Sequence, residues 1–277
     1  MHFLAQFEGV RANFGIEYCA YGCCGYYVVH MPIANRYILQ GVACHLTHRC
    51  HDRKFLLKFD VHRKEYRKRL RMTLRGSGVS LLSYCITSNH VHLLVWADDP
   101  DSLAHFMQKL QGEFAKWYNL RKRRTGAFWN GRYHATMVES GDHLWRCMRY
   151  INLNMVRAGV VLHPREWRWC GYDEIVGQRG KYLVLDREKL LELSDAGSAM
   201  ELAVNHETMV GEAIAAGRLE REPQWANSVA VGSEGFVRSV AESNVWRARL
   251  EIREACDDAW VVRDAESPYG ISACSGV

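Results

Sequence analysis

Short apolar runs alternate with longer amphipathic segments through the middle of the chain. Residues 42–49 alternate apolar and polar positions, as a half-buried strand does. Residues 79–86 and 91–96 are two further apolar runs on either side of a polar turn, so we expect them to pair as antiparallel strands. Residues 133–138 predict a fourth, shorter strand.

Three segments with helical periodicity lie between and after these strands. Residues 60–75 place apolar side chains at helical spacing, and Asp60 is expected to cap the helix. Residues 101–119 begin with acidic and polar residues and then carry one apolar face. Residues 141–157 predict a second long helix that stops near Gly159.

The expected elements follow the order β-α-β-β-α-β-α. This is the order of a ferredoxin-like split β-α-β fold with one added helix. Such an α+β fold has an antiparallel sheet that carries its helices on one face. We expect this core to span residues 31–181, because an aromatic cluster (Trp167, Trp169 and Tyr172) follows the last helix and is suited to pack back onto it.

Two flanking regions are predicted outside this core. Residues 1–30 lack a clear amphipathic period and are expected to form a poorly structured extension, which makes Met31 a candidate for the natural start. Residues 182–277 have mixed charge and short elements, which predicts a smaller, partly helical accessory region.

The distribution of basic residues says more than the formal net charge of +5. One stretch contains Lys109, Lys116, Arg121, Lys122, Arg123, Arg124 and Arg132. Its aromatic neighbours are Trp117, Tyr118, Phe128, Trp129 and Tyr133. This mixture suits phosphates and bases together, although a basic tract alone is as often a solvated loop.

The cysteine pattern and the apolar runs bear on location. The cysteines form no paired C-x-x-C, and no cleavable signal peptide is visible. No apolar run approaches the ~20 residues that a membrane span requires. We therefore expect reduced thiols, no membrane partner and a cytoplasmic, nucleoid-associated location.

The sharpest local feature is a pair of histidines on a predicted strand. His90 and His92 are separated by one residue, so the pleat points both imidazoles to the same face, at a distance suited to one metal ion. The alternative is a half-exposed strand pattern with no ligand, because isolated short motifs often occur by chance.

A second pair lies on a predicted helix. Tyr150 and Asn154 are four positions apart and should project from the same side. The alternative is that Tyr150 is an aromatic at the edge of the core and Asn154 simply lies near the helix end.

Three segments together carry a family resemblance: ITSNHVHLLV (86–95), TGAFWNGRYHATMV (125–138) and RYINLNMVRAGVV (149–161). Their order and spacing resemble those of REP-associated tyrosine transposases, bacterial relatives of the single-tyrosine HUH insertion-sequence transposases. The resemblance spans about residues 31–270.

The resemblance implies a chemistry and a substrate. His90 and His92 would bind Mg²⁺ or Mn²⁺, with Asn154 as the third ligand. Tyr150 would attack a DNA phosphodiester and leave a 5′-phosphotyrosine and a free 3′-OH. The substrate would be single-stranded DNA beside a hairpin of the REP type. Ligand chemistry alone would also admit softer divalent ions, so the resemblance is what favours Mg²⁺ or Mn²⁺.

The DNA-binding candidates come from the resemblance and from the basic tract together. The region of the tract and the start of the chain help relatives to recognise a hairpin with single-stranded flanks. The expected contacts are Arg49, Lys116, Arg121, Lys122, Arg123, Arg124, Trp129 and Arg132. Whether the chain acts as a monomer or a homodimer stays open.

Other interpretations compete with this one. Tyr118 is the rival nucleophile, but it has no amide or carboxylate four residues later, which favours packing or base stacking. The segment CHLTHRCH (44–51), with Cys44, His45, His48, Cys50 and His51, imitates a zinc site but matches no common spacing. At the level of function, the alternatives are a hairpin-binding regulator without turnover and a replication-initiator or relaxase-type nickase.

Overall fold

The protein is described by a computed structural model over residues 38–243, 250–255 and 259–264. The predicted extension 1–30 and the candidate start at Met31 lie outside the described residues. Within the described residues, no helix combines the length and the apolar composition needed to cross a membrane.

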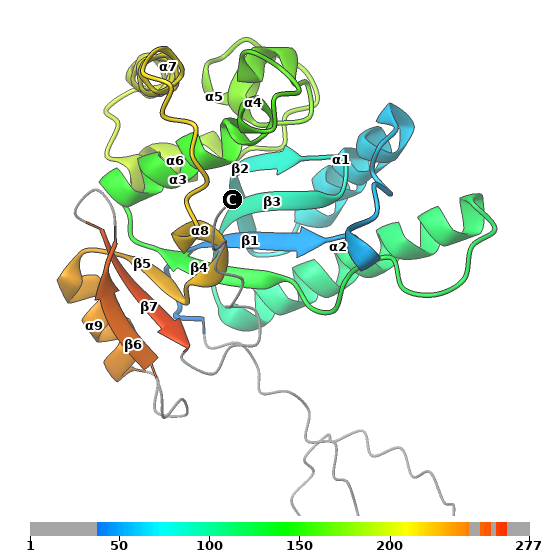
Figure 1. Ribbon diagram of the computed structural model, residues 1–277, viewed down its shortest axis with the longest axis horizontal. Helices are drawn as coiled ribbons and strands as arrows, with labels where there is room; N and C mark the ends of the chain where they lie inside the picture. The colour runs from blue at the N-terminus through cyan, green and yellow to red at the C-terminus, as the bar shows by residue number, and fades with distance from the viewer. Residues whose placement is uncertain (1–37, 244–249, 256–258, 265–277) are drawn as a thin grey trace, which may run out of the picture. The chain divides into compact units, whose positions relative to one another are not determined.

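Four strands build the sheet of the core (Figure 1). They are β1 (Ala43–Arg49), β2 (Val79–Ile86), β3 (His90–Ala97) and β4 (His134–Val138). Their spatial order is β2-β3-β1-β4, and each neighbouring pair is antiparallel. This order confirms the predicted ferredoxin-like fold.

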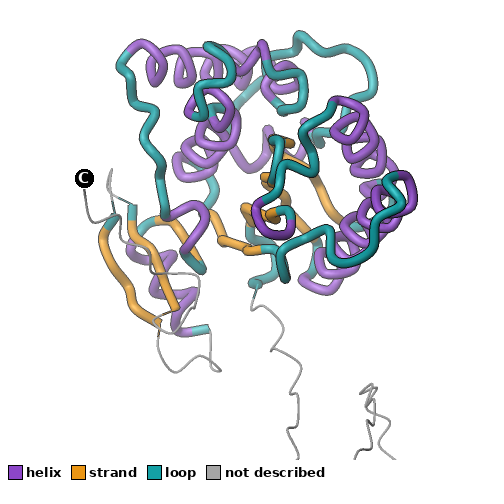
Figure 2. The backbone as a smooth tube through the Cα atoms, turned by 45° about the vertical axis from the view of Figure 1, so that its right-hand side comes forward, coloured by secondary structure: helices purple, strands orange, loops and turns teal. Residues whose placement is uncertain are grey.

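Helices cover both faces of this sheet, whereas the sequence predicted helices on one face. On β1, the His48 ring stacks on Trp129, which in turn contacts Tyr66 of helix α1 (Asp60–Leu74). His45, on the opposite face of the same strand, lies against Tyr150 of α3 (Asp142–Asn152). Helix α2 (Pro100–Arg121) packs with α1, so the added helix α3 has a face of its own (Figures 1 and 2).

The helix ends differ from the sequence prediction in their capping. The N-cap of α1 is Phe59, so Asp60 lies in the first turn and accepts hydrogen bonds from Arg63 and Trp169. The N-cap of α2 is Asp99, whose Oδ1 accepts from the Ser102 amide at 2.8 Å. The last predicted helix is divided at Leu153 into α3 and α4 (Asn154–Arg157), although Leu153 itself keeps a right-handed helical backbone conformation.

The accessory region extends the same sheet. Strand β5 (Ala230–Gly232) pairs parallel with β4, and β7 (Trp260–Asp264) and β6 (Leu250–Glu254) follow. The described sheet is therefore seven-stranded, in the order β2-β3-β1-β4-β5-β7-β6, and mixed rather than purely antiparallel. The pairing of β4 with β5 brings residues after 220 close to the core.

The remaining described helices are η1 (His51–Arg53), η2 (Pro164–Glu166), α5 (Tyr172–Ile175), α6 (Arg187–Ser194), α7 (Ala199–Ala215), α8 (Gln224–Asn227) and α9 (Glu234–Glu242). The predicted aromatic cluster does pack back on the core, since Trp169 and Tyr172 are buried. A β-bridge between Cys85 and Cys170 ties this segment to β2.

Candidate active site

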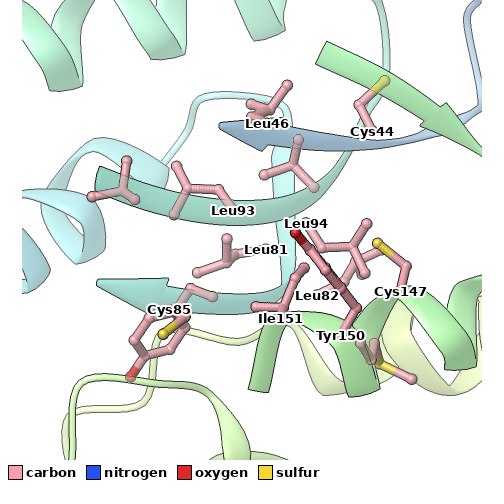
Figure 3. Close-up of a cluster of buried hydrophobic side chains, with 14 of the residues drawn as sticks. Cys44, Leu46, Leu81, Leu82, Cys85, Leu93, Leu94, Cys147, Tyr150 and Ile151 are labelled. Carbon is pink, nitrogen blue, oxygen red and sulfur yellow. The ribbon is translucent and has the colours of Figure 1, made fainter. Parts of the chain in front are cut away.

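Tyr150 projects from α3 and packs against histidines of the sheet. Its ring is 4% exposed, and its centroid lies 6.0 Å from that of His92 and 6.0 Å from that of His45, edge to face in both cases. Figure 3 shows Tyr150 pointing from α3 toward the strands. A phenol from a helix and an imidazole from a strand therefore meet, as the sequence predicted.

The other predicted site residues gather at the same place. His90 and His92 project from the same face of β3, with ring centroids 4.7 Å apart. Asn154, the first residue of α4, reaches His92, and 2.9 Å separates its Nδ2 from His92 Nε2. Asn154 can do this because the chain continues helically through Leu153, whose amide donates to the Arg149 carbonyl at 2.9 Å.

The hydrogen bonds of His90 fix the tautomer of its neutral ring. Its Nδ1 lies 2.7 Å from Asn89 Oδ1 and 2.9 Å from Thr87 Oγ1. An amide oxygen only accepts, so Nδ1 carries the proton. The lone pair of Nε2 is therefore available for a ligand.

The hydrogen bonds of His92 lead to the same result. Asn154 Nδ2 only donates, so His92 Nε2 is the acceptor and carries the lone pair. His92 Nδ1 then carries the proton and donates to His45 Nε2 at 2.9 Å. Both histidines of the strand motif thus have Nε2 unprotonated.

Burial keeps these imidazoles neutral. Desolvation lowers the pKa of His90 to about 3, and the cations Arg49 and Arg221 act in the same direction. Desolvation also holds the pKa of His92 well below its usual range, and His90, His45, Arg49 and Arg157 add to the effect. Neutral imidazole is the form that binds a metal ion.

This donor set fits a divalent cation. Two imidazole Nε2 atoms with lone pairs and one carboxamide lie together, whereas the described residues contain no group of three His, Cys, Asp or Glu side chains suited to a metal. Asn154 presents its amide nitrogen to His92, so its amide would have to rotate for the oxygen to act as the third ligand. Substrate phosphate oxygens and water would supply the remaining positions.

Arginines surround the phenol. The guanidinium of Arg157 lies 4.4 Å from the Tyr150 ring centroid. Arg49 is the cross-strand partner of His90, at the open end of β1. Burial raises the pKa of Tyr150, while the positive charges of Arg157 and Arg221 act to lower it. These charges favour both a phenolate and an anionic substrate.

Sequence reasoning missed several of these groups. Arg157 lies within one of the three segments that carry the resemblance, so its position could have indicated a role. His45 was considered only as a zinc ligand. Arg221 gave no signal in the sequence, because it approaches the site only through the fold of the accessory region.

Apart from Arg49, which is exposed beside His90, the predicted DNA-contacting residues divide into two groups. Lys116, Arg121, Lys122, Arg123 and Arg132 are exposed, most of them at the end of α2. There, Lys122 Nζ lies 5.6 Å from the ring centroid of Phe59, which is itself 55% exposed. The guanidinium of Arg121 lies 5.8 Å from the Trp117 ring. An exposed ring beside exposed lysine and arginine side chains suits an unpaired base and its phosphate.

Arg124 and Trp129 are placed differently. Arg124 donates to Asn119 Oδ1 at 2.9 Å and to the Ala127 carbonyl at 2.7 Å, so it holds the turn after α2 together. Trp129 is 8% exposed, and its indole N–H donates to the Gln111 carbonyl. Its ring therefore packs in the core between Tyr66 of α1 and Phe114 of α2, so little of it is exposed for a DNA contact.

The rival sites find no support in the geometry. Tyr118 is 6% exposed and packs against Phe128 and His62, which agrees with the packing interpretation. In the segment CHLTHRCH, His45 and His48 face opposite sides of the sheet. Within the part of the chain that is described, the cysteines and histidines of this segment form no metal cluster.

Comparisons with known proteins match part of the chain to one family model. Residues 39–154 match the family model described as IS200-like transposase. No curated protein is similar enough to the chain to count as a match.

Two solved structures are similar to part of the chain. One is a REP-associated tyrosine transposase bound to a REP hairpin, with 17% identity over 56% of this chain and 90% of that one, and a TM-score of 0.46. The other is a putative transposase from Deinococcus radiodurans R1, with 19% identity over 47% of this chain and 92% of that one, and a TM-score of 0.30. Neither likeness is close enough to carry a function over.

Proposed function

We propose that this protein cleaves and rejoins single-stranded DNA beside a hairpin, and the match of residues 39–154 to the IS200-like transposase family model supports this. Tyr150 is the nucleophile, and His90, His92 and Asn154 hold a Mg²⁺ or Mn²⁺ ion. The observation that carries this proposal is the convergence of the four side chains, with Asn154 bonded to His92 and the Tyr150 ring 6.0 Å from the His92 ring.

The reaction is a transesterification. Tyr150 Oη forms a bond to the phosphorus and loses its proton, while the bond from phosphorus to the 3′ oxygen breaks and that oxygen leaves as a 3′-OH. The phosphotyrosine ester conserves the energy of the original bond, so a 3′-OH can reseal it without ATP. A bound divalent cation would neutralise and orient the scissile phosphate.

Residues of the chain assist this step without the ion. The guanidinium of Arg157 over the Tyr150 ring favours the phenolate, and Arg49 lies next to His90, where a phosphate would approach. The burial of the phenol removes competing water from the nucleophile.

The path of the DNA follows from the exposed cations. Arg49 and Arg53 are exposed where β1 ends and η1 begins, and Arg49 is the cross-strand partner of His90; a second exposed surface is formed by Phe59, Lys122 and Arg121. This surface suits the single-stranded flank of a hairpin. A homodimer is compatible with the proposal but is not required by it.

This DNA path predicts the effect of two kinds of substitution. Replacing Arg121 and Lys122 with Gln should reduce the slope of log affinity against log salt by roughly 1.4, because each phosphate contact to a single strand contributes roughly 0.7. Phe59→Ala should weaken binding by about 1–3 kcal/mol with little change in that slope, since stacking is not ionic. Fluorescence anisotropy with hairpin DNA at several salt concentrations measures both.

The matched control is Arg238→Gln on α9, at the other end of the sheet, where an exposed cation pairs with Glu234. It should leave binding unchanged. If the double substitution keeps the wild-type salt slope, the DNA runs elsewhere.

The proposed activity is tested with end-labelled oligonucleotides that carry a hairpin and a single-stranded flank, incubated with Mn²⁺. The expected result is cleavage at one position in the flank and rejoining when an oligonucleotide with a free 3′-OH is added. EDTA should stop both reactions. Hairpin binding with no cleavage in Mn²⁺ or Mg²⁺ would instead support a regulator without turnover.

A further inference from the structure

We propose that His45 is a positioning residue for His92, and that the backbone carbonyl of Trp225 holds His45 in turn. A segment of the accessory region, residues 220–228, would then complete the active site from outside the matched family domain. This inference rests on the proposed function only in its consequence for metal binding.

Three groups form a continuous buried chain of hydrogen bonds. His45 Nδ1 lies 2.7 Å from the Trp225 carbonyl oxygen, and His45 Nε2 lies 2.9 Å from His92 Nδ1. The two rings are stacked, with centroids 5.1 Å apart and planes inclined by 10°. His45 is 0% exposed and His92 is 3% exposed, so water cannot replace these bonds.

The direction of every bond in this chain is determined from one end. A carbonyl oxygen only accepts, so His45 Nδ1 carries the proton and Nε2 carries the lone pair. His92 Nδ1 must then donate to His45, which leaves the lone pair of His92 on Nε2. Asn154, at the other end, agrees with this assignment, because its amide nitrogen faces His92 Nε2; its amide can rotate to present oxygen instead, so the Trp225 end is the one that fixes the tautomer.

The Trp225 carbonyl, where this series of hydrogen bonds begins, is itself held in place. Trp225 lies in α8, a helix of one turn whose last carbonyls have no intrahelical partner. Thr136 Oγ1 lies 3.3 Å from the same carbonyl and 2.8 Å from the Ser228 carbonyl, to which it makes the shorter bond, and the buried indole N–H of Trp225 donates to Glu222 Oε2 at 2.7 Å.

The segment before α8 is fixed against α3, which carries the tyrosine, and against α4. Arg157 Nε donates to the Glu220 carbonyl at 3.1 Å, and Glu222 lies 3.8 Å from the guanidinium of Arg149. The Trp225 ring lies 6.3 Å from that of Tyr150. The segment therefore contacts the site in two places. It bonds to His45, which bonds to His92, and it packs against α3 beside Tyr150.

The consequence is that His92 presents the lone pair of Nε2 before any metal ion binds. A neutral imidazole can carry its proton on either nitrogen, and the hydrogen bond of one nitrogen decides which lone pair is presented. Without an acceptor at His45, the buried Nδ1–H of His92 would lose its partner, and the ring could turn or change tautomer. Groups that orient a metal-bound histidine in this way are worth about 10–100-fold in metal affinity.

Two substitutions distinguish the loss of the hydrogen bond to His92 from a change in side-chain volume. In His45→Gln, a side-chain oxygen reaches the place of Nε2 and can still accept from His92. In His45→Asn, the shorter amide keeps a group near Nδ1 for the Trp225 carbonyl but leaves His92 without an acceptor. His206→Ala is the matched control. His206 is also fully buried, but it lies on α7 and bonds to Asn152 of α3 instead of to His92.

The first measurement needs no metal. Nitrogen NMR of the imidazoles should show His92 protonated on Nδ1 in the wild type, in His45→Gln and in His206→Ala, and should show loss of that form in His45→Asn. A wild-type His92 protonated on Nε2, or an unchanged His92 in His45→Asn, overturns the inference.

The second measurement is Mn²⁺ affinity by calorimetry. We expect roughly 10–100-fold weaker binding in His45→Asn and values near wild type in His45→Gln and His206→Ala. Equal weakening in all three variants would indicate a loss of folded structure and contradict positioning. If His92 has the expected tautomer but the wild type binds no Mn²⁺, the metal in the proposed function is wrong and the positioning role stands.

Discussion

Replacing Tyr150 with Phe is expected to lower DNA cleavage by at least about 10³-fold and to abolish the covalent protein–DNA adduct. The substitution removes one oxygen from a ring that otherwise keeps its contacts with His92, His45 and Arg157. Hairpin binding should therefore stay near the wild-type value. Denaturing gels of the adduct and anisotropy of the same DNA measure the two effects separately.

The matched control is Tyr118→Phe. Tyr118 was the rival nucleophile, and it is also a buried tyrosine that packs against other rings. Its hydroxyl should be dispensable for cleavage. An adduct that persists in the Tyr150 variant and disappears in the Tyr118 variant would reverse the assignment.

Replacing His92 with Ala is expected to have the second largest effect, with loss of measurable cleavage and of Mn²⁺ binding. His92 contacts three side chains of the site. Its Nε2 faces Asn154, its Nδ1 faces His45 and its ring faces Tyr150. Removal takes away a ligand and also leaves the Nε2 of His45 without a partner. Cleavage kinetics and calorimetric titration with Mn²⁺ measure the loss.

Stability has to be measured beside this variant, because a buried ring is deleted. His206→Ala again provides the comparison, and both variants should lose thermal stability to a similar degree while only the His92 variant loses cleavage. A His92 variant that cleaves hairpin DNA at the wild-type rate would show that the strand histidines serve packing alone.

Much of the core could be predicted because its signals are local. The bounds of β2 agree with the apolar run 79–86, and those of β1, β3 and α2 differ from the expected ranges by at most two residues at either end. Alternation and helical spacing depend only on neighbouring positions. The spacing of His90, His92, Tyr150 and Asn154 was enough to place them on a strand and a helix, and the fold then brought them together.

The remaining features depend on contacts that are distant in sequence. The parallel pairing of β4 with β5 joins Met137 to Ala230, and no local pattern announces it. The same pairing brings Trp225 to His45 and Arg221 near Tyr150, so the contribution of the accessory region could not be inferred from its composition.

The basic tract illustrates a different difficulty. The sequence shows that aromatic and basic residues are close together, but not which rings are buried. Trp129 fills the core, whereas the exposed ring beside Lys122 is Phe59, which lies far from the tract in sequence. Arg124 resembles its neighbours in charge, yet its donors are engaged by the turn after α2.

Mapping of the covalently modified residue is the most direct measurement of the central claim. Wild-type protein is incubated with single-stranded hairpin DNA and Mn²⁺, the adduct is isolated and digested, and the modified peptide is sequenced by mass spectrometry. We predict a nucleotide attached through phosphate to Tyr150, in the peptide that also contains Asn154. A nucleotide attached to any other residue, with Tyr150 unmodified, would contradict the proposed active site.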